Sequence, residues 1–533
     1  MKTTQGWDRK ARLGMLMAAC LLCPVGTATA QMAVPVKEVV FHNPVLFADY
    51  SDPDVIRDGA NYYLVASTFH FVPGIPILQS TDLVHWTIVG HVVQKLEMSP
   101  RYSMTGGNGY GNGVWAPSIR KHDGLYYVYF PTPTEGIFMS TAADIAGPWS
   151  KPAAVIAGAG LEDPCPFWDD DGNAYLVHSK TGAGPLILHR MSADGSHVLD
   201  EGKVIVQDPA HLPTLEGPKM YKRNGYYYIF APFGGVGVGS QAVLRSRQIY
   251  GPYDEHVVLS QGTTNINGPH QGGYVETPDG TGWFLHFQQD GAHGRIVHLE
   301  PVLWKDDWPV MGEAAEGAQT GQPVASGLVR EHAPGAQHQR PQTSDEFDEP
   351  KLGMQWEWNH NPEDAHWSLT ARPGFMRLLP MQAEGLLTAR NTLTQCMQDN
   401  SFEFTARVDL TGMRAGVHAG VAMFEKTASG LEVVQQGNEL RLNFFHQLET
   451  LPGPVVAQGA IELRVRIEGD VAHYAYSVDD GKTFVALGGA TPIRFSWWKG
   501  SRPALFAYST VETDAGVVDF DWVHYRPVGI NPW

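Results

Sequence analysis

Three acidic residues in the first half of the chain occupy equivalent places in a repeated pattern. Asp52, Asp163 and Glu216 each stand close to the start of an apolar run that leads to a glycine turn. Cleavage of a glycosidic bond needs a protonated acid at the leaving oxygen and an ionised carboxylate on the other face of the sugar. A third carboxylate can keep the acid protonated near neutral pH by charge repulsion. The trio therefore indicates acid–base hydrolysis of a glycoside, whereas a lone Asp before proline would indicate only a turn.

The elements that would position these residues come from an internal repeat. Five segments share an apolar strand, a charged turn centred on glycine, and a second strand rich in Tyr or Trp; they read "DVIRDGANYYLVAS", "SIRKHDGLYYVYFP", "PFWDDDGNAYLVHS", "KMYKRNGYYYIFAP" and "YVETPDGTGWFLHF". The turn glycines are Gly59, Gly124, Gly172, Gly225 and Gly280, spaced by 65, 48, 53 and 55 residues. A period of roughly 50 residues is typical of the blades of a β-propeller.

A propeller would bring one end of each repeat to a common point. The innermost strands run in the same direction along the central channel, so the residues just before them meet at one end of the axis. These residues are Asp52, Trp115, Asp163, Glu216 and His270, which lie 7, 9, 9, 9 and 10 residues ahead of their turn glycines. Converging carboxylates disfavour one another's ionisation, and such a cost usually accompanies function. A meandering sandwich is the alternative explanation of the repeat.

The composition limits the class of protein and of partner. Glycine (58 residues), proline (37) and aromatic residues (11%) favour short strands joined by tight turns, and 533 residues exceed one usual core. A formal net charge of −18 disfavours nucleic acids and anionic membranes as partners. A neutral carbohydrate fits the charge, and Trp115 would suit the apolar face of a sugar ring.

Residues 1–30 have the pattern of a secretory signal. Basic residues at positions 2, 9, 10 and 12 precede an apolar run over residues 13–25, and small residues occupy positions 28–30. A retained membrane anchor is the alternative, but the run is shorter than the roughly 20 residues that a span needs. The mature chain is expected to begin at Gln31 and to be exported to the periplasm or the medium. Cys165 and Cys396 remain after cleavage, and we expect them to be buried apolar residues without a disulfide framework.

The second half of the chain predicts a different β-structure. Residues 313–343 are small and polar without sustained periodicity, which is typical of a linker. Alternating strands then resume in "SFEFTARVDL", "IELRVRIEGDVAHYAYSVDDGKTFVAL" and "GVVDFDWVHYRP". They predict a two-sheet sandwich over residues 344–533. The expected all-β chain thus consists of a signal (1–30), a five-bladed β-propeller (31–312), a linker (313–343) and a β-sandwich (344–533).

An ordered set of motifs resembles a known family. Residues 43–312 contain "NPVLFADYSDPDV", "GVWAPSIR", "EDPCPFWDDDG", "EGPKMYKRNGYYYIF" and "GRIVHLEPV". Together they resemble glycoside hydrolase family 43, five-bladed enzymes that act on xylans and arabinans. Residues 344–533 resemble the concanavalin-like jelly roll of many β-xylosidases in this family, which can lend a loop to the pocket rim, although nothing in the sequence identifies that loop. The resemblance implies an exo-acting, inverting glycosidase that releases xylose or arabinofuranose from plant cell-wall oligosaccharides or polysaccharides and requires no cofactor.

The resemblance also assigns roles to the three acidic residues. Asp52 matches the general base, Glu216 the general acid, and Asp163 the residue that orients the acid and tunes its pKa. Inversion implies that base and acid lie roughly 6.5–9.5 Å apart with a water molecule between base and sugar. Asp54 falls one step into the strand, where the family usually has a small residue, so a direct catalytic role is not expected.

Further matches concern substrate binding and a metal ion. Phe69 and Trp115 match aromatic subsite walls, and Arg295 matches an arginine that reaches substrate hydroxyls. His270 matches a channel histidine that in many members faces a bound calcium ion or a water cluster. A structural Ca²⁺ in the propeller channel is therefore an expectation of the resemblance alone.

Two other functions fit parts of the pattern. A five-bladed β-fructosidase would have Asn-Asp-Pro-Asn, Arg-Asp-Pro and Glu-Cys, where this chain has "SDPDV", "EDPCP" and "EGPKM". A non-catalytic, lectin-like propeller would bind sugars but have little use for the full acidic trio. The sequence does not choose between xylose and arabinofuranose and does not indicate an oligomeric state.

Overall fold

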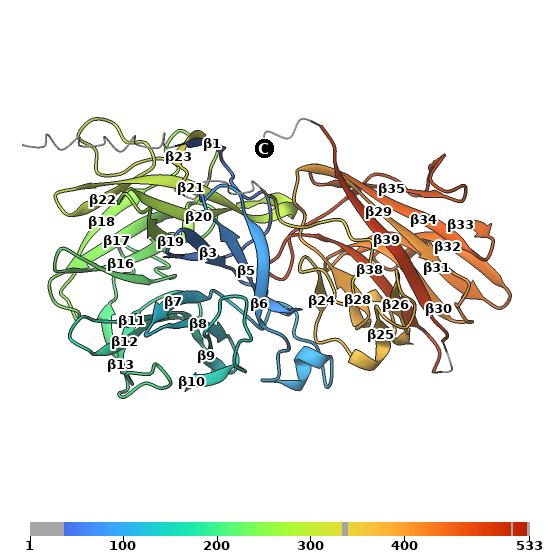
Figure 1. Ribbon diagram of the computed structural model, residues 1–533, viewed down its shortest axis with the longest axis horizontal. Coiled ribbons are helices and arrows are strands. Elements are labelled where there is room, and N and C mark those ends of the chain that lie inside the picture. Colours follow the sequence, from blue (N-terminus) through green and yellow to red (C-terminus); the bar gives the residue numbers. More distant parts are fainter. Residues whose placement is uncertain (1–36, 333–338, 513–514, 530–533) are drawn as a thin grey trace, which may run out of the picture. The chain divides into compact units, whose positions relative to one another are not determined.

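The structure is a computed structural model that describes residues 37–332, 339–512 and 515–529, whose regular secondary structure is almost entirely β-strand (Figure 1). The expected secretory signal lies outside the described residues. Residues from Lys37 onward form one compact unit. In the described ranges, no helix has the length and apolar character that a membrane crossing would require. The helical turns of these ranges are short 3-10 helices, η1 (Pro100–Ser103), η2 (Gly291–His293), η3 (Asp364–His366) and η4 (Leu386–Thr388).

Five four-stranded antiparallel sheets confirm the expected propeller, drawn in blue to yellow-green in Figure 1. Blade 1 contains β2 (Asp54–Asp58), β3 (Asn61–Val65), β5 (Gly74–Ser80) and β6 (Thr87–Val93). Blade 2 contains β7 (Ser118–His122), β8 (Leu125–Thr132), β9 (Gly136–Ala142) and β10 (Ala153–Ala157). Blade 3 contains β11 (Leu161–Trp168), β12 (Ala174–Lys180), β13 (Leu186–Met191) and β14 (Lys203–Val206).

The remaining two blades complete the repeat. Blade 4 contains β15 (Lys219–Arg223), β16 (Tyr226–Phe233), β17 (Ser240–Ser246) and β18 (Asp254–Leu259). Blade 5 contains β19 (His270–Glu276), β20 (Gly282–Asp290), β21 (Gly294–Lys305) and β22 (Trp308–Met311). Each of the five repeat glycines turns the first strand of its blade into the second and has a positive φ, between 61° and 83°, a conformation that glycine adopts without steric cost.

Two larger sheets form the concanavalin-like sandwich, drawn in orange to red in Figure 1. The first has the order β33 (Glu449–Val456), β32 (Glu439–His446), β31 (Ser429–Gln436), β30 (Val417–Phe424), β38 (Arg502–Ser509), β28 (Thr392–Thr394), β24 (Glu357–Asn359) and β4 (Phe71–Val72), with β27 (Met381–Gln382) beside β38. The second has the order β25 (Trp367–Ser368), β26 (Met376–Leu378), β39 (Val518–Pro527), β29 (Ser401–Asp409), β34 (Ala460–Glu468), β35 (Val471–Ser477) and β36 (Val485–Ala486), with β37 (Thr491–Pro492) beside β35.

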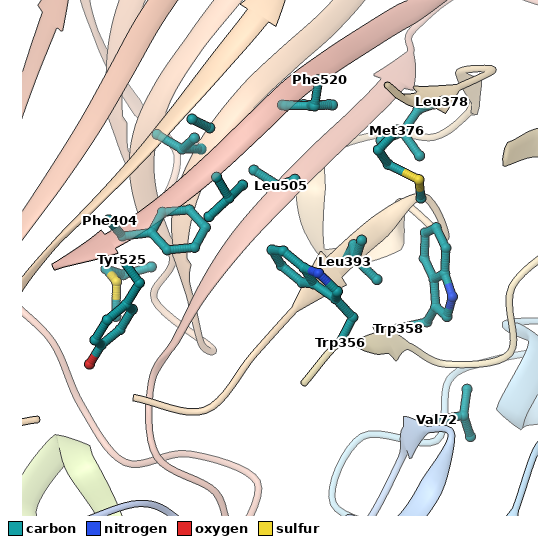
Figure 2. Close-up of a cluster of buried hydrophobic side chains, with 14 of the residues drawn as sticks. Val72, Trp356, Trp358, Met376, Leu378, Leu393, Phe404, Leu505, Phe520 and Tyr525 are labelled. Carbon is teal, nitrogen blue, oxygen red and sulfur yellow. The ribbon is translucent and has the colours of Figure 1, made fainter. Parts of the chain in front are cut away.

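The propeller and the sandwich share backbone pairing and apolar core. Strand β4 comes from the propeller half of the sequence, yet it pairs with β24 through Trp358–Val72 and Asn359–Phe71. One cluster of buried apolar side chains includes Val72 together with Trp356 and Trp358 of the sandwich (Figure 2). The two halves therefore stabilise one another, and loops of the sandwich can contribute to a site in the propeller.

The segment expected as a linker contains regular structure. Strand β23 (Ser326–Arg330) lies within residues 313–343 and pairs with β1 (Glu38–His42), from Glu38–Arg330 to His42–Ser326. The pairing joins residues almost 300 positions apart, so a local composition rich in small polar residues could not reveal it. Cys165 and Cys396 are both free; Cys165 is fully buried and Cys396 is partly so.

Candidate active site

One cavity of about 450 Å³ contains all seven residues that the sequence singled out. It is lined by Asp52, Phe69, Trp115, Ala116, Glu162, Asp163, Thr181, Gly182, Ala183, Thr214, Glu216, Gly235, Val236, His270, Gln271, Arg295 and Trp498. The lining comes from all five blades and from one loop of the sandwich. A second cavity, of about 300 Å³ beside β1, holds none of the predicted residues.

Asp52 is held by one charged and one neutral donor. It precedes β2, is buried, and has a positive φ of 53°, which turns its side chain out of the strand direction. The Arg295 Nη1 donates to its Oδ1 at 2.9 Å, and the Ser67 hydroxyl donates to its Oδ2 at 2.6 Å. Both contacts stabilise a negative charge on Asp52 and fix the direction of its two oxygens.

A buried ion pair between Asp49 of the propeller and Lys499 of the sandwich supports the residues that donate to Asp52. Asp49 accepts the backbone N–H of Arg295 at 3.0 Å, and the Lys499 ammonium lies 3.2 Å from the Asp49 carboxylate. Lys499 also donates to the backbone carbonyls of Asp49 at 2.7 Å and Ser67 at 3.2 Å. The loop that carries Lys499 thus reaches both residues that donate to Asp52.

Asp163 accepts three hydrogen bonds but has no charged donor. Its Oδ2 accepts the N–H of Gly217 at 2.8 Å, the Gln271 amide at 3.1 Å and the Ser179 hydroxyl at 3.2 Å. Burial, followed by the negative charge of Glu216, raises the pKa of Asp163 to about 7. This carboxyl group therefore changes its charge close to neutral pH.

Asp163 lies inside strand β11 and not before it. The pairing of β11 with β12 shifts between Glu162 and Cys165, and Asp163 has a φ of 54°. In a regular strand, adjacent side chains point to opposite faces, whereas a bulge re-aims them. Consequently Glu162 and Asp163, although consecutive, both line the cavity.

Glu216 is the most accessible of the three expected carboxyl groups. It precedes β15, and 21% of its side chain is exposed, compared with 2% for His270. The His270 Nε2 contacts the Glu216 Oε1 at 2.8 Å. Glu216 therefore has one fixed oxygen and remains open to a bound molecule.

Aromatic side chains also line the cavity, and Trp498 among them lies at its rim. The Phe69 and Trp115 rings meet edge to face with centroids 6.2 Å apart, and the Trp115 indole N–H donates to the Gly111 carbonyl at 2.9 Å. Trp498 of the sandwich meets Trp115 at 6.2 Å and is 49% exposed. Such a rim offers apolar faces on which a sugar ring can pack.

Sequence reasoning missed Trp498 and Glu162. The signal for the first was "SWWKG" (residues 496–500), two adjacent Trp residues before a glycine, but their neighbours along the chain do not indicate a contact with the propeller. Glu162 was missed because adjacent residues of a regular strand point to opposite faces, so a residue next to Asp163 was not expected in the cavity. Asp54, which was not expected to be catalytic, is fully buried and ion-paired with Arg120 at 2.6 Å, and it does not line the cavity.

Three carboxyl groups lie close enough together for one oxygen of each to bind the same cation. Oxygens of Glu162, Asp163 and Glu216 all lie within 4.8 Å of one another, and no other trio of His, Cys, Asp or Glu in the described ranges is so compact. Asp163 and Glu216 already have protein partners, and protonation of a member relieves the repulsion equally well. The calcium ion expected near His270 stays a prediction: the His270 Nε2 contacts Glu216, whereas the buried Nδ1 has no hydrogen-bond partner among the described residues.

Comparisons with known proteins agree with this geometry. The model of glycosyl hydrolases family 43 matches residues 41–309, and that of the beta xylosidase C-terminal concanavalin A-like domain matches residues 344–526. A Xylanibacter ruminicola protein, provisionally named a beta-xylosidase, is 42% identical over 459 residues, which are 85% of this chain and 84% of that protein. A non-reducing end alpha-L-arabinofuranosidase of Bacteroides ovatus is 32% identical over 68% of this chain and 69% of its own length.

A solved structure extends the similarity to nearly the whole fold. The bifunctional GH43-CE protein of Bacteroides eggerthii has a TM-score of 0.82 and 29% identity over 93% of this chain. The aligned region is 64% of that longer protein, so this chain spans about two thirds of its length. The matched family model, the relatives and the carboxyl-lined propeller cavity together establish that the chain belongs to glycoside hydrolase family 43 and is a glycosidase.

Proposed function

We propose that the protein is an exo-acting, inverting glycosidase that releases xylose or arabinofuranose from plant cell-wall glycans. The observation that carries the proposal is the contrast among the carboxyl groups of one cavity. Asp52 is ion-paired with Arg295, burial raises the pKa of Asp163 to about 7, and Glu216 is open to the cavity. The names of relatives, a beta-xylosidase and an alpha-L-arabinofuranosidase, support the two candidate sugars.

The proposed mechanism uses the chain's own carboxyl groups. Glu216 donates its proton to the glycosidic oxygen as the bond to the leaving group breaks. Asp52, which Arg295 and Ser67 orient, accepts a proton from the water molecule that attacks the anomeric carbon on the opposite face, and the configuration inverts. Asp163 accepts the N–H of Gly217 and so fixes the backbone next to Glu216, which orients the acid.

The rim supports release from a chain end. Phe69 and Trp115 pack edge to face, and Trp498 adds a third aromatic wall from the sandwich. Sugar rings expose apolar C–H faces that suit such walls. The cavity lies at the converging ends of five blades, so a glycan enters from one side with its terminal residue foremost.

The proposal extends to export, domains and cofactors. The pattern of residues 1–30 supports a cleaved signal and residence in the periplasm or outside the cell, with catalysis in residues 31–312 and the sandwich in residues 344–533. Because the proton donor and acceptor are both side chains, we propose that hydrolysis needs no cofactor. The net charge of −18 supports a neutral glycan as the partner over a nucleic acid.

Activity and stereochemistry test the proposal together. Residues 31–533 are assayed on aryl β-D-xylopyranoside, aryl α-L-arabinofuranoside and xylobiose, and the anomer first formed is identified by NMR. We expect release of at least one sugar with inversion, and Glu216→Gln should lower the rate on unactivated xylobiose or arabinoside by roughly 10²–10⁴. Glu201→Gln, an exposed carboxyl of blade 3, is the matched control.

Three outcomes would contradict the proposal. Retained configuration would contradict inversion, and undiminished turnover of the natural linkage by Glu216→Gln would contradict the role of Glu216. Sugar binding without turnover of any substrate would favour a lectin-like propeller.

A further inference from the structure

Glu162 is a fourth carboxyl group in the cavity, and the mechanism above does not use it. It is 4% exposed, lines the cavity, and its Oε1 accepts the N–H of Ala183 at 3.2 Å. Across residues 37–332, 339–512 and 515–529, no donor reaches its Oε2. Asp52 and Asp163, by comparison, accept from two and three donors. Glu162 therefore has hydrogen-bonding capacity that the protein leaves unused.

The spacing of the neighbouring carboxyl groups suits one bridging hydroxyl. An oxygen of Glu162 lies within 4.8 Å of oxygens of Asp163 and Glu216, and no direct hydrogen bond joins the three groups in the described part of the chain. A hydroxyl oxygen contacts each of two carboxyl oxygens at about 2.7 Å, so it spans a separation of up to about 5.4 Å. A sugar hydroxyl thus fits between Glu162 and its neighbours.

We propose, building on the glycosidase function proposed above, that Glu162 binds a hydroxyl group of the sugar released in the cavity, beside the acid Glu216. The β11 bulge turns Glu162 towards the cavity, and the Ala183 amide holds its Oε1 in place. The remaining oxygen then selects sugars that present a hydroxyl at that point. Glu162 is in this way a specificity-determining residue.

The electrostatic surroundings give Glu162 the right protonation state for this task. Burial, followed by the negative charges of Asp163 and Glu216, raises its pKa to about 9, and Asp52 adds to the effect. The cationic or titratable partners that line the cavity, Arg295 and His270, are paired with Asp52 and Glu216. A neutral carboxylic acid both donates and accepts a hydrogen bond, as a hydroxyl does.

The inference is tested by a double cycle, in which the Glu162 side chain and single hydroxyl groups of the substrate are removed separately and together. The wild type, Glu162→Leu and Glu162→Gln are assayed on whichever aryl glycoside the wild type prefers and on analogues that each lack one ring hydroxyl. We expect Glu162→Leu to lower kcat/KM on the parent substrate by roughly 10-fold but to have little further effect on the one analogue that lacks the bound hydroxyl. Glu162→Gln, which keeps a neutral donor and acceptor, should retain most of the discrimination.

The outcomes separate this inference from the proposed function. A wild type that releases neither sugar contradicts the function itself. An active wild type whose Glu162→Leu loss is equal on every analogue overturns the inference and makes Glu162 a structural residue. A third outcome is that EDTA removes the wild-type activity, that a divalent cation restores it, and that Glu162→Gln no longer responds to the cation. This outcome overturns the inference in favour of a cation site.

Thermal stability gives a second measurement that does not depend on turnover. Because the pKa of Glu162 rises from 4.5 to about 9 on folding, the wild type should lose stability relative to Glu162→Gln as the pH rises through this window. We expect equal melting temperatures near pH 4.5 and a higher melting temperature for Glu162→Gln at pH 8, by about 1–3 °C. If the difference in melting temperature between the wild type and Glu162→Gln does not depend on pH, Glu162 is not neutral in the folded protein, and the proposed hydroxyl binding by a neutral carboxylic acid is overturned.

Discussion

Two walls of the cavity hold the same kind of group in opposite electrostatic surroundings. The Asp52 wall consists of Asp52, Ser67 and Arg295, and its carboxylate accepts from a guanidinium. The Glu216 wall consists of Glu162, Asp163 and Glu216; among the described residues its hydrogen-bond partners are amides, a hydroxyl and His270, but no Lys or Arg. A guanidinium pairs with the carboxylate of one wall, whereas on the other wall burial and mutual repulsion raise the pKa of Asp163 to about 7 and that of Glu162 to about 9. The neighbours, and not the carboxyl groups themselves, therefore make the two walls electrostatically different.

The walls also differ in what supports them. Behind the Asp52 wall, Asp49 and Lys499 form a buried ion pair that joins the propeller to the sandwich. The donors to Asp163 and Glu216, in contrast, all come from the propeller. The sandwich is thus coupled to Asp52 more closely than to Glu216.

The largest expected effect comes from removing a charge from the Glu216 wall. Asp163→Asn should lower kcat/KM by about 100-fold and remove the change in kcat/KM near pH 7 that the titration of Asp163 produces. The reason is that the pKa of Asp163 is about 7, whereas an amide in its place neither gains nor loses a proton in that range. Asp171→Asn, an exposed carboxyl of the same blade, is the control. A change in kcat/KM near pH 7 that persists in Asp163→Asn would show that another group produces it.

A smaller effect is expected when the support of the Asp52 wall is cut. Lys499→Met should reduce kcat by about 10-fold and change KM less, because Asp49 then holds the Arg295 backbone less firmly and the Ser67 carbonyl loses its Lys499 donor. Removal of one partner of a buried ion pair should also lower the free energy of unfolding, by about 3–5 kcal/mol. Rates are measured well below the melting temperature, with the exposed Lys482→Met of the same domain as control. An unchanged kcat in a destabilised Lys499→Met protein would restrict Lys499 to a structural role.

The sequence predicted the parts of both walls that repeat. Glycine turns at a period of roughly 50 residues identified five hairpins, and the equivalent position ahead of each hairpin identified Asp52, Trp115, Asp163, Glu216 and His270. Periodicity works here because each blade forms from consecutive strands, so local spacing determines which residues meet at the axis.

The missed parts depend on local irregularity or on distant contacts. Strand alternation places neighbouring residues on opposite faces, so only the bulge at Asp163, with its φ of 54°, brings Glu162 into the cavity. Lys499 lies 450 positions from Asp49, its ion-pair partner, and no periodic pattern links the two. The pairing of β23 with β1 was hidden by the same kind of separation.

The smallest effect concerns the rim that the sandwich contributes. Trp498→Ala should raise KM by about 2- to 10-fold and leave kcat nearly unchanged, because Trp498 packs on Trp115 at the rim while the carboxyl groups stay in place. Trp522→Ala, which removes a ring stacked on His524 elsewhere in the sandwich, should leave KM unaltered. A fall in kcat with KM unchanged would mean that Trp498 acts on the Asp52 wall through the adjacent Lys499. In that case the sandwich would serve only to orient the base, and binding of the sugar would rest on the propeller.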